Sequence, residues 1–591
     1  MATDTTRPPA SLRALFALVA IAGLSGLAAC GGGGGGSGAS TGTPAPPPSS
    51  GTAVLSVALA GGASPGIDHL WVTVTGVAMN TDATKVYGDG DPGWVVQTLA
   101  APVTLDLADP SLSQGQSLSL LKQDVTTLGT FAQLRLLVAP SDPGLVLDPS
   151  ASAAGLQFND QVQYTDSSGV HIVPLEIPDI QAGLRLLTPF NLSTDTTTPL
   201  AIEWNANSLV RRASAGGADR FTLRNELQLY NQQLLTALGD GNLEIGGSIF
   251  DSISGQLDTT NFCTGASHVG CIHDVVASAT SLSSDSRFHA EARSVDVSAA
   301  GTFLLYPLPS QSLYDVVIHG GNMRTIVVHN VFVDPTGLLK PAPTALSSAA
   351  TPIVPVLDTS ERAVTVANAL SPAGSRVFFG QTVAGSGGTG TDVPYTIVTA
   401  AADPATGRPL DTVTLPGGPL QHATFDTATD GNGVPPAFAS VTPTEGLGAW
   451  TVWAQGTLAT STGATTTLAA GATTATVANP VARTAFAAGT LTVAVSGTTG
   501  NGADHAELIV SNDGGTVAVV DVSAQIAAHG GSTTINVPSG ASTDAPGAAV
   551  YGVALRSWVA ASETSTTRWV RASAPIDLSS ATSASVSLTL P

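Results

Sequence analysis

The sequence predicts an all-β protein built from several β-sandwich modules in tandem. Short runs that alternate apolar or β-branched residues with polar ones recur along the chain, such as HLWVTVTGVAM at 69–79 and HAELIVSN at 505–512. Clusters of turn-forming residues, such as GDGDPG at 88–93 and NDGG at 512–515, separate these runs. This spacing of short strands and turns is typical of sandwiches and barrels. Helical periodicity is scarce, and the best helix candidate is the short QSLSLLKQD at 116–124.

Length and composition limit the classes of function. A chain of 591 residues accommodates three or four domains at ~150 residues each. Its formal net charge is −22, and its lysines are only Lys85, Lys122 and Lys340. No basic stripe is present to neutralise phosphates, so the sequence argues against nucleic acid as a partner. Only 11% of the residues are charged, but 43% are hydrophobic, which indicates a folded rather than a disordered chain.

Residues 1–29 are interpreted as an export signal that ends at a lipidation site. Arg7 and Arg13 supply positive charge, the apolar stretch 12–24 follows, and small residues come next. The stretch is shorter than the ~20 apolar residues that a membrane-spanning helix needs. The final residues, Leu27, Ala28, Ala29 and Cys30, resemble the lipobox of bacterial lipoproteins. The resemblance implies acylation of Cys30, and the alternative is an ordinary signal peptide cut near Ala29.

Residues 30–51 are predicted to tether a folded body to a membrane. Six glycines follow Cys30 and give a flexible segment, and the proline-rich PAPPP at 44–48 gives a stiffer one. Several acyl chains anchor a protein firmly, because each buried CH₂ contributes ~0.8 kcal/mol. Cys30 is followed by Gly31 rather than Asp, which resembles the sorting pattern for the outer membrane in Gram-negative lipoproteins. We therefore expect a protein anchored in the outer membrane.

Residues 52–231 form the first predicted domain, and they carry a family resemblance. GIDHLWVTVTGVAMN at 66–80 resembles the opening of an uncharacterised bacterial lipoprotein domain, catalogued as domain of unknown function forty-three eighty-two. Further matching segments follow in the expected order: GWVV at 93–96, LDL at 105–107, TFAQLRLLV at 130–138, IPDIQAGLRLLTPFNLS at 177–193, LAIEWNANSLV at 200–210 and FTLRNELQLY at 221–230. The resemblance implies a β-sandwich and brings no established activity.

Three further modules are predicted after the first domain. Residues 243–334, with GSIFDSISGQ at 247–256 and YDVVIHGG at 314–321, resemble a transthyretin-like or carboxypeptidase-regulatory-like sandwich. The resemblance implies a non-catalytic spacer. Residues 339–352 are interpreted as a linker or an extended crossover. Residues 353–459 and 489–591 are predicted to be further sandwiches of the immunoglobulin-like or transthyretin-like kind, and these two regions could also form one interleaved unit.

Two cysteines remain once Cys30 is assigned to lipidation. Cys263 and Cys271 lie close together in NFCTGASHVGCIHD, and in an exported chain such a pair predicts a disulfide. The alternative is a zinc site, because His268 and His273 interleave with the cysteines. The spacing matches no common zinc finger, and thiolates outside the cytosol are prone to oxidation.

The acidic loops raise the possibility of calcium. Asp426, Asp430 and Asn432 in FDTATDGNG offer oxygen ligands on a glycine-rich turn, and Asp89 and Asp91 do so in YGDGDPGW. Neither loop has the spacing of an EF-hand, and Asp-Gly and Asn-Gly are also ordinary turn sequences. The calcium hypothesis is therefore weighed against plain turns, and no other cofactor is expected.

Three further patterns of residues bear on chemistry. Ser267 beside His268 lacks the Gly-x-Ser-x-Gly spacing of a nucleophile elbow. His319 and His329 flank one expected hairpin, where they are either metal ligands or polar residues at strand ends. The tryptophans supply core packing or a sugar-stacking platform. Trp450 and Trp453 are expected on opposite faces of one strand. Trp558 and Trp569 are expected on neighbouring strands.

These observations predict a lipid-anchored protein of the cell envelope that is not an enzyme. Its expected work is surface binding or adhesion, with a glycan, matrix or envelope protein as ligand. A second hypothesis is a structural lipoprotein that faces the periplasm. A third is a hydrolase of polysaccharide or ester, which would require a concave site with a perturbed carboxylate or an activated serine.

Overall fold

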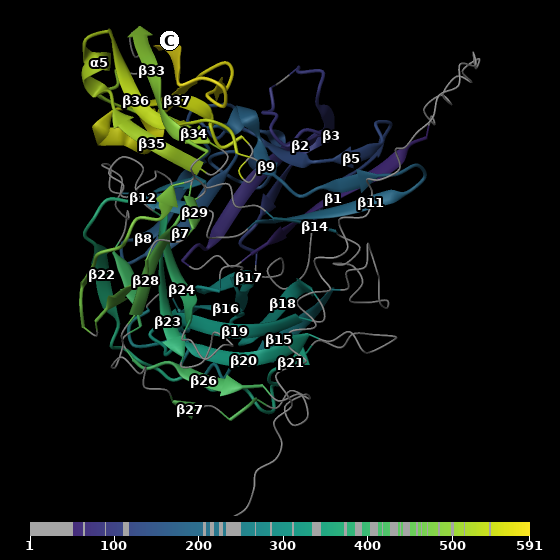
Figure 1. Cartoon of the computed structure of the whole chain (residues 1–591), viewed down its shortest axis with the longest axis vertical. Coiled ribbons are helices and arrows are strands. Elements are labelled where there is room, and N and C mark those ends of the chain that lie inside the picture. Colours follow the sequence, from purple (N-terminus) through teal and green to yellow (C-terminus); the bar gives the residue numbers. More distant parts are fainter. Residues whose placement is uncertain are drawn as a thin grey trace, which may run out of the picture. The chain divides into compact units, whose positions relative to one another are not determined.

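The computed structural model describes residues 51 to 590 with internal gaps. The gaps are 63–65, 89, 110–117, 205–208, 213–217, 224–227, 232–249, 266–267, 284–285, 310–311, 334–343, 371–374, 384–392, 402–411, 417, 426–434, 438, 441–449, 457–458, 462–463, 470, 483–484, 498–501, 513–514, 543–544 and 546. All described residues belong to one compact unit, Gly51–Pro591. Strands dominate it, as the sequence predicts, and the described helices are short (Figure 1).

Two sheets enclose the core of the first domain. A four-stranded sheet has the order β14-β11-β1-β4, and a larger sheet has the order β12-β13-β8-β7-β2-β6-β9 with β3 paired to β2. The strands of the first sheet are β1 (Ala53–Gly61), β4 (Leu118–Val125), β11 (Thr197–Trp204) and β14 (Gln228–Asn231). Those of the second are β2 (His69–Asn80), β3 (Val95–Asp106), β6 (Gln133–Val138), β7 (Gln161–Asp166), β8 (Gly169–Glu176), β9 (Leu184–Leu186), β12 (Leu209–Arg212) and β13 (Arg220–Leu223). Buried residues from both sheets form one hydrophobic cluster, so the two sheets pack as a sandwich.

Smaller elements complete this domain. A two-stranded sheet pairs β5 (Gly129–Phe131) with β10 (Phe190–Leu192), and the helical segments are α3 (Pro149–Ala153) and η1 (Ile180–Ala182). The expectation of a helix near 116–124 is wrong for its described part, which is strand β4. This segment pairs antiparallel with β1, where Leu121 lies opposite Val57 and a bulge shifts the register. Pairing with β1 buries Leu120, Leu121 and Val125 in the sandwich, and this burial outweighs the weak helical pattern.

A ten-stranded sheet joins strands from the two middle regions of the chain. Its order is β27-β26-β20-β19-β16-β17-β24-β23-β28-β30. The strands are β16 (His273–Leu282), β17 (His289–Asp296), β19 (Ser312–Gly321), β20 (Ile326–Val333), β23 (Arg376–Val383), β24 (Val393–Ala401), β26 (Gln421–Thr424), β27 (Ala439–Ser440), β28 (Trp450–Gln455) and β30 (Thr466–Leu468). Val316 and Ile318 of β19 belong to one buried cluster and Val317 to another, so the centre of the sheet is covered on both faces.

Small sheets accompany the large one. They are β18 (Thr302–Pro309), β15 (Phe250–Gln256) and β21 (Thr344–Ala345) in one, β25 (Val413–Leu415), β22 (Arg362–Val366) and β31 (Thr474–Ala475) in another, and the pair β29 (Ala459–Ser461) and β32 (Val481–Ala482). Strand β21 lies in the predicted linker and pairs parallel with β15.

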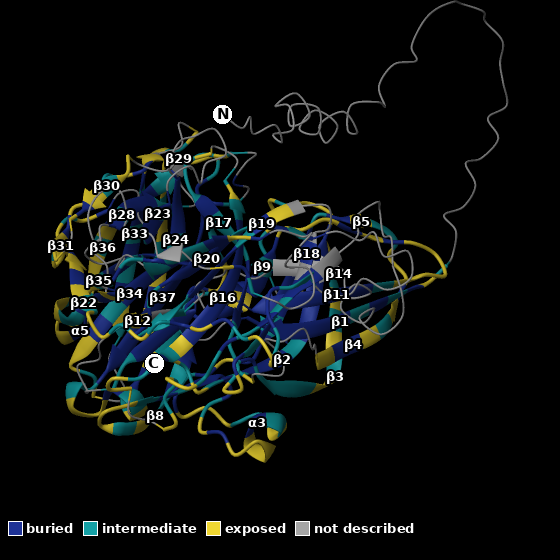
Figure 2. Ribbon diagram, turned by 90° about the horizontal axis from the view of Figure 1, so that it is seen from below, coloured by how far each residue is buried: buried dark blue, intermediate teal, exposed yellow. Residues whose placement is uncertain are grey.

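The C-terminal module is a second clear two-sheet sandwich. One sheet has the order β36-β33-β40, and the other has the order β35-β34-β37-β38 with β39 on β37. The bounds are β33 (Ala487–Gly497), β34 (His505–Asn512), β35 (Gly515–Asp521), β36 (Gly530–Ser539), β37 (Val550–Trp558), β38 (Arg568–Arg571), β39 (Ile576–Asp577) and β40 (Ser583–Leu590), with α5 (Ser523–Ala527), η3 (Ala560–Ser562) and α6 (Glu563–Thr566). Alternate residues of β33, Leu491, Val493 and Val495, are buried in the shared core. Buried residues concentrate on strands throughout (Figure 2). Among the described residues, no helix has the length and apolar character to cross a membrane.

Candidate functional site

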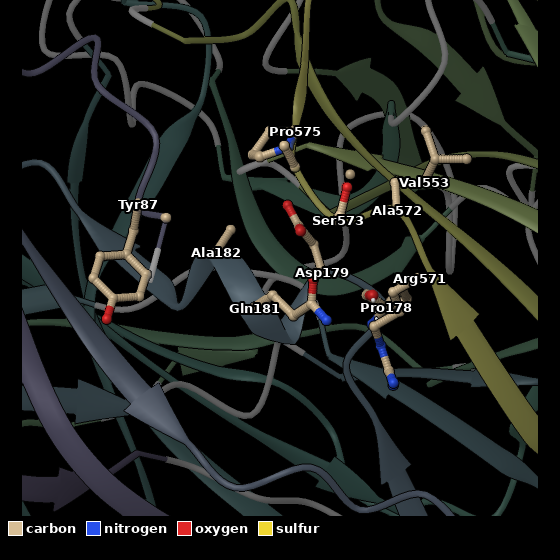
Figure 3. A pocket seen from close by; sticks show the side chains of 13 residues that line it. Tyr87, Pro178, Asp179, Gln181, Ala182, Val553, Arg571, Ala572, Ser573 and Pro575 are labelled. Atoms are coloured by element: carbon tan, nitrogen blue, oxygen red, sulfur yellow. Dashed lines mark hydrogen bonds between the residues drawn. The ribbon is translucent and has the colours of Figure 1, made fainter. Parts of the chain in front are cut away.

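A pocket with a mixed polar and apolar lining lies between the first domain and the C-terminal module. Its volume is about 630 Å³. The first domain contributes Tyr87 from the loop after β2 and the segment 178–182, which contains η1. The C-terminal module contributes part of β37 and the segment 571–575, which begins at the last residue of β38. Figure 3 shows these side chains around the pocket. The site is thus built by segments that are far apart in the sequence.

The pocket lining offers both donors and acceptors of hydrogen bonds. Gln181 and Ser573 line the pocket and are exposed, so their amide and hydroxyl groups are accessible to a ligand. Asp179 adds a carboxylate. The Asp179 side chain lies over Gly552 of β37, where an added Cβ would lie 2.4 Å from the Asp179 Cγ. A glycine at this position therefore leaves room for the carboxylate in the pocket wall.

An ion pair links Arg571 of the pocket lining to Asp142 of the first domain. Arg571 Nη1 and Nη2 donate to the two carboxylate oxygens of Asp142, each at 2.8 Å, across 429 residues of sequence. Arg571 Nε donates to the Pro178 carbonyl at 3.3 Å, and the Trp569 ring lies under the guanidinium. Two parallel bonds to one carboxylate fix orientation as well as distance. Arg571 therefore positions the segment that carries Ser573.

A buried network of three arginines and three glutamates joins the same two parts of the chain. Arg220 of β13 donates to Glu176 through Nε at 3.1 Å and through Nη2 at 2.8 Å, and to Glu507 of β34 at 3.1 Å. Arg556 of β37 lies 3.0 Å from Glu176 and 2.8 Å from Glu563. The sixth member is Arg212, whose Nη2 lies 3.9 Å from Glu507. The charges balance within the network, as buried charges require.

The electrostatics of the network favour its charged form. Burial alone would raise the pKa of Glu176, but the guanidinium groups of Arg220 and Arg556 lower it to about 2. Burial likewise opposes the charge of Arg220, yet Glu176 and its other carboxylate neighbours raise the pKa of Arg220. The network therefore remains ionised at neutral pH and holds the two walls of the pocket in one arrangement.

The predicted disulfide is present between Cys263 and Cys271. Both sulfurs are therefore used, and the alternative of a zinc site with two cysteine ligands is wrong for this structure. His268, His273 and Asp274 nevertheless gather beside the disulfide, with one ligand atom of each within 4.8 Å of the others. This is the group of described residues that could hold a metal ion.

The hairpin histidines lie apart rather than facing each other. The register of β19 and β20 pairs Ile318 with Ile326 and Val316 with Val328. His319 therefore lies at the turn end of the pairing, and His329 lies in its middle, at the bulge. Burial lowers the pKa of His319 to about 4, so it is neutral at physiological pH. The hypothesis that the two histidines share a metal ion is therefore wrong.

His329 instead belongs to a polar cluster on the ten-stranded sheet. The Tyr395 hydroxyl donates to Asp315 Oδ2 at 2.7 Å and lies 2.9 Å from His329 Nδ1. His422 Nδ1 lies 3.3 Å from His329 Nε2, and the His289 ring stacks on Tyr395 at 4.1 Å. Burial would raise the pKa of Asp315, but hydrogen bonds from His329 and Tyr395 lower it. The cluster is a hydrogen-bonded support for β19, β20, β24 and β26.

Other predicted features have structural roles. Asp91 accepts a hydrogen bond from the backbone N–H of Gly93 at 2.8 Å, which is turn chemistry. Trp450 and Trp453 are both buried in β28. Trp558 and Trp569 do lie on neighbouring strands, β37 and β38, but the register places Arg556 rather than Trp558 opposite Trp569.

Several predicted positions lie outside the described residues. They are the lipobox Leu27, Ala28, Ala29 and Cys30, the calcium candidates Asp426, Asp430 and Asn432, and the loop residues Asp89 and Ser267. The structure gives no account of these residues, and the expectations about them remain predictions.

The comparisons with known proteins identify the first domain. Residues 52–224 match the family model described as "Domain of unknown function (DUF4382)", which confirms the resemblance found in the sequence. The match concerns this part of the chain. No curated protein matches the sequence significantly.

Matches among solved structures are distant. The Bacillus anthracis TIE protein is 9% identical, with coverage of 89% of this chain and 69% of that chain and a TM-score of 0.13. A leucine-rich repeat protein from Bacteroides thetaiotaomicron is 12% identical, with coverage of 39% and 26% and a TM-score of 0.13. A streptococcal ancillary pilin is 11% identical, with coverage of 58% and 99% and a TM-score of 0.11. Similarity at this level carries no inference about this chain.

Proposed function

We propose that the protein is a lipid-anchored binding protein of the bacterial cell envelope, and that it is not an enzyme. The sequence supports the anchor, because the lipobox-like residues 27–30 precede a flexible tether at 30–51. Gly31 after the cysteine supports the outer membrane as the location. The resemblance of the first domain to an uncharacterised bacterial lipoprotein domain also supports this address. In this proposal the transthyretin-like region 243–334 acts as a spacer.

The observation that carries the binding role is the pocket of about 630 Å³, whose mixed lining includes polar side chains. Asp179 accepts hydrogen bonds, while Gln181 and Ser573 can both donate and accept them. Arg571 is already engaged by Asp142 and Pro178, so it adds little free positive charge to the pocket. The net charge of −22 repels anions. A neutral ligand rich in hydroxyl groups, such as an uncharged glycan, fits this lining best.

The lining argues for binding rather than catalysis. Ser573 is a hydroxyl group in the pocket, but the described lining contains no histidine to act as its base. Asp179 is the only carboxylate among the described lining residues, and glycoside hydrolysis ordinarily uses a pair. The pocket is therefore assigned to recognition of a ligand.

Glycan-array binding of the purified protein tests the proposal. Ser573→Trp fills the pocket, and Gln181→Ala removes one polar contact at an exposed position. The matched control is Ser580→Trp, which places the same side chain at an exposed residue outside the pocket. We expect binding of a neutral glycan that Ser573→Trp abolishes and Ser580→Trp preserves. Equal binding by both tryptophan variants would exclude the pocket as the binding site.

A structural role in the envelope is the second candidate. The buried network around Arg220 and Glu176 favours it, because such a network makes the body a rigid spacer whether or not a ligand is bound. This role predicts no glycan binding and protection of the body from external protease.

A further inference from the structure

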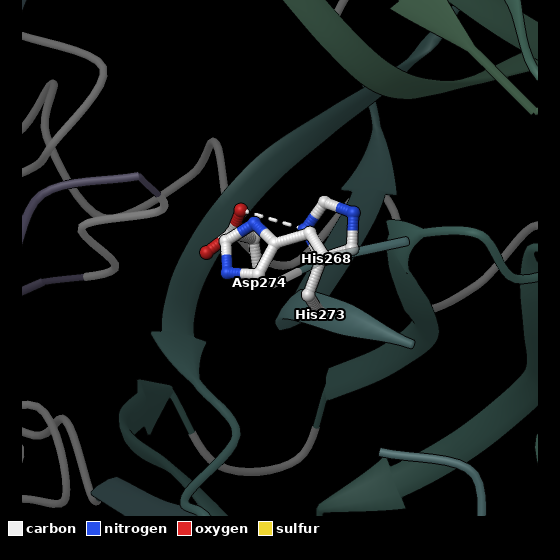
Figure 4. Close-up of side chains that lie close together, drawn as sticks. All are labelled: His268, His273 and Asp274. Carbon is white, nitrogen blue, oxygen red and sulfur yellow. Dashed lines mark hydrogen bonds and ion pairs between the residues drawn. The ribbon is translucent and has the colours of Figure 1, made fainter. Parts of the chain in front are cut away.

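We propose that His268, His273 and Asp274 bind a divalent transition-metal ion of the zinc type. Figure 4 shows the three side chains gathered at the start of β16 and the loop before it. One ligand atom of each residue lies within 4.8 Å of the others. This site is separate from the pocket and does not depend on the proposed binding function.

The donor set selects the class of metal. Two imidazoles and one carboxylate suit zinc and neighbouring transition metals, whereas calcium requires oxygen ligands throughout. Zinc bonds of ~2.1 Å in tetrahedral geometry place two donors roughly 3.4 Å apart. A pair of donors as far apart as 4.8 Å must therefore approach by an ångström or so. His268 is exposed, so rotation of its side chain supplies this movement.

Neighbouring residues hold the loop in place. The disulfide between Cys263 and Cys271 closes the loop that contains His268. Asn322 Nδ2 donates to the His268 carbonyl at 2.9 Å and to the Cys271 carbonyl at 3.0 Å. The ends of this loop are thus joined covalently, and the carbonyls of His268 and Cys271 are held by the Asn322 amide. Preorganisation of this kind reduces the entropy lost when an ion binds.

The space around His273 is matched to its ring. Gly321 of β19 pairs with His273 of β16, and a Cβ on Gly321 would lie 2.3 Å from the imidazole. Glycine therefore lets the ring lie flat over β19. His273 Nδ1 lies 2.9 Å from Asp274 Oδ2, and the His268 and His273 rings stack at 4.1 Å. An incoming ion would take the place of the proton shared by Nδ1 and the carboxylate, and this proton would pass to solvent.

The site leaves a coordination position open. Three protein ligands leave the fourth position of a tetrahedral ion to water or to a donor from another molecule. The exposure of His268 keeps this position accessible. The arrangement is therefore that of an open metal site rather than a closed structural one.

Titration of the purified full-length protein with zinc chloride, followed by calorimetry in non-reducing buffer, tests the proposal. We expect one zinc ion per chain and no comparable binding of calcium. His268→Ala and His273→Ala should each weaken zinc binding by more than the ~10–100-fold that is typical for loss of an outer-shell partner. The matched control is His505→Ala, because His505 pairs with Asp504 in the same adjacent arrangement and is likewise exposed. This control should leave zinc affinity unchanged.

A second variant separates metal binding from folding. Gly321→Ala keeps all three ligands but displaces the His273 ring, so it should weaken zinc binding while circular dichroism remains that of the native protein. Absence of zinc binding to the native protein would overturn the proposal. So would zinc affinity that is the same in the native protein, His268→Ala and Gly321→Ala.

Discussion

Replacing Arg220 by methionine tests whether the buried ion-pair network holds the first domain and the C-terminal module together. The Arg220 side chain is only 9% exposed, and that of its main partner Glu176 is 4% exposed. Methionine keeps most of the volume but removes the charge. Among the described residues, Glu176 then keeps Arg556 as its ion-pair partner and the hydroxyl of Thr222 as a hydrogen-bond donor. The ion-pair partner left to Glu507 there is Arg212, at 3.9 Å. One negative charge is left buried without compensation.

The size of the effect follows from this imbalance. Breaking a buried ion pair by removing one partner costs about 3–5 kcal/mol. At 1.36 kcal/mol for each tenfold change, this corresponds to a rise of roughly 10²-fold to 5 × 10³-fold in the local opening equilibrium. The double variant Arg220→Met/Glu176→Gln restores charge balance. Its cost should therefore fall well below the sum of the two single variants.

Hydrogen–deuterium exchange of peptides that cover β8, β13 and β37 measures this local opening directly. The matched control is Arg211→Met in the neighbouring strand, where the arginine is 44% exposed and pairs with Asp219. An exposed pair of this kind contributes about 0–1 kcal/mol. The reasoning is refuted if Arg220→Met changes exchange in these strands no more than Arg211→Met does.

Further predictions concern other parts of the fold. Cys263→Ser should lower the melting temperature of the region around β15–β20 in scanning calorimetry, because loss of so short a closed loop costs about 2–3 kcal/mol. Addition of reductant should not lower the melting temperature of this variant further. Burial raises the pKa of Asp160 to about 7, against hydrogen bonds from Ser141 and Thr73. Because its pKa is raised, the Asp160 carboxyl binds a proton more tightly in the folded state than in the unfolded state. The stability that this proton contributes is complete below pH ~4 and is lost as the pH rises to about 7. Urea denaturation at pH 4 and pH 8 should therefore show that the free energy of unfolding of the native protein falls by about 2–4 kcal/mol relative to that of Asp160→Asn. A difference in unfolding free energy between the two proteins that is the same at both pH values would contradict the assignment. Tyr395→Phe should lower the free energy of unfolding, measured by chemical denaturation, by about 1–3 kcal/mol. The reason is that Asp315 and His329 both lose the Tyr395 hydroxyl as a partner.

The sequence predicts strands better than it predicts their partners. The runs at 69–79 and 505–512 form β2 and β34, because their alternation of apolar and polar residues is a local signal. The family of the first domain and the disulfide at Cys263 also follow from local patterns. The segment 118–125 was harder to assign, since its burial depends on a bulged pairing with β1.

The candidate site was beyond sequence reasoning for a physical reason. Arg571 and Asp142 are 429 residues apart, and no pattern around either residue indicates its partner. The same holds for Glu176 and Arg556, which lie in different sandwiches. Two expected regions, 243–334 and 353–459, share one ten-stranded sheet, and the pairing of β17 with β24 is again a contact over long sequence distance. The grouping of His268 and His273 was closer to prediction, because the two histidines are close in sequence.

Protease treatment of intact cells tests most directly the proposal of a lipid-anchored protein that binds ligands at the cell surface. The experiment compares the native protein with Cys30→Ala, and lysed cells serve as the control for digestion. We predict that the native protein fractionates with the membrane and is digested on intact cells, whereas Cys30→Ala is released from the membrane. Protection of the native protein until lysis, or retention of Cys30→Ala in the membrane fraction, would contradict the account.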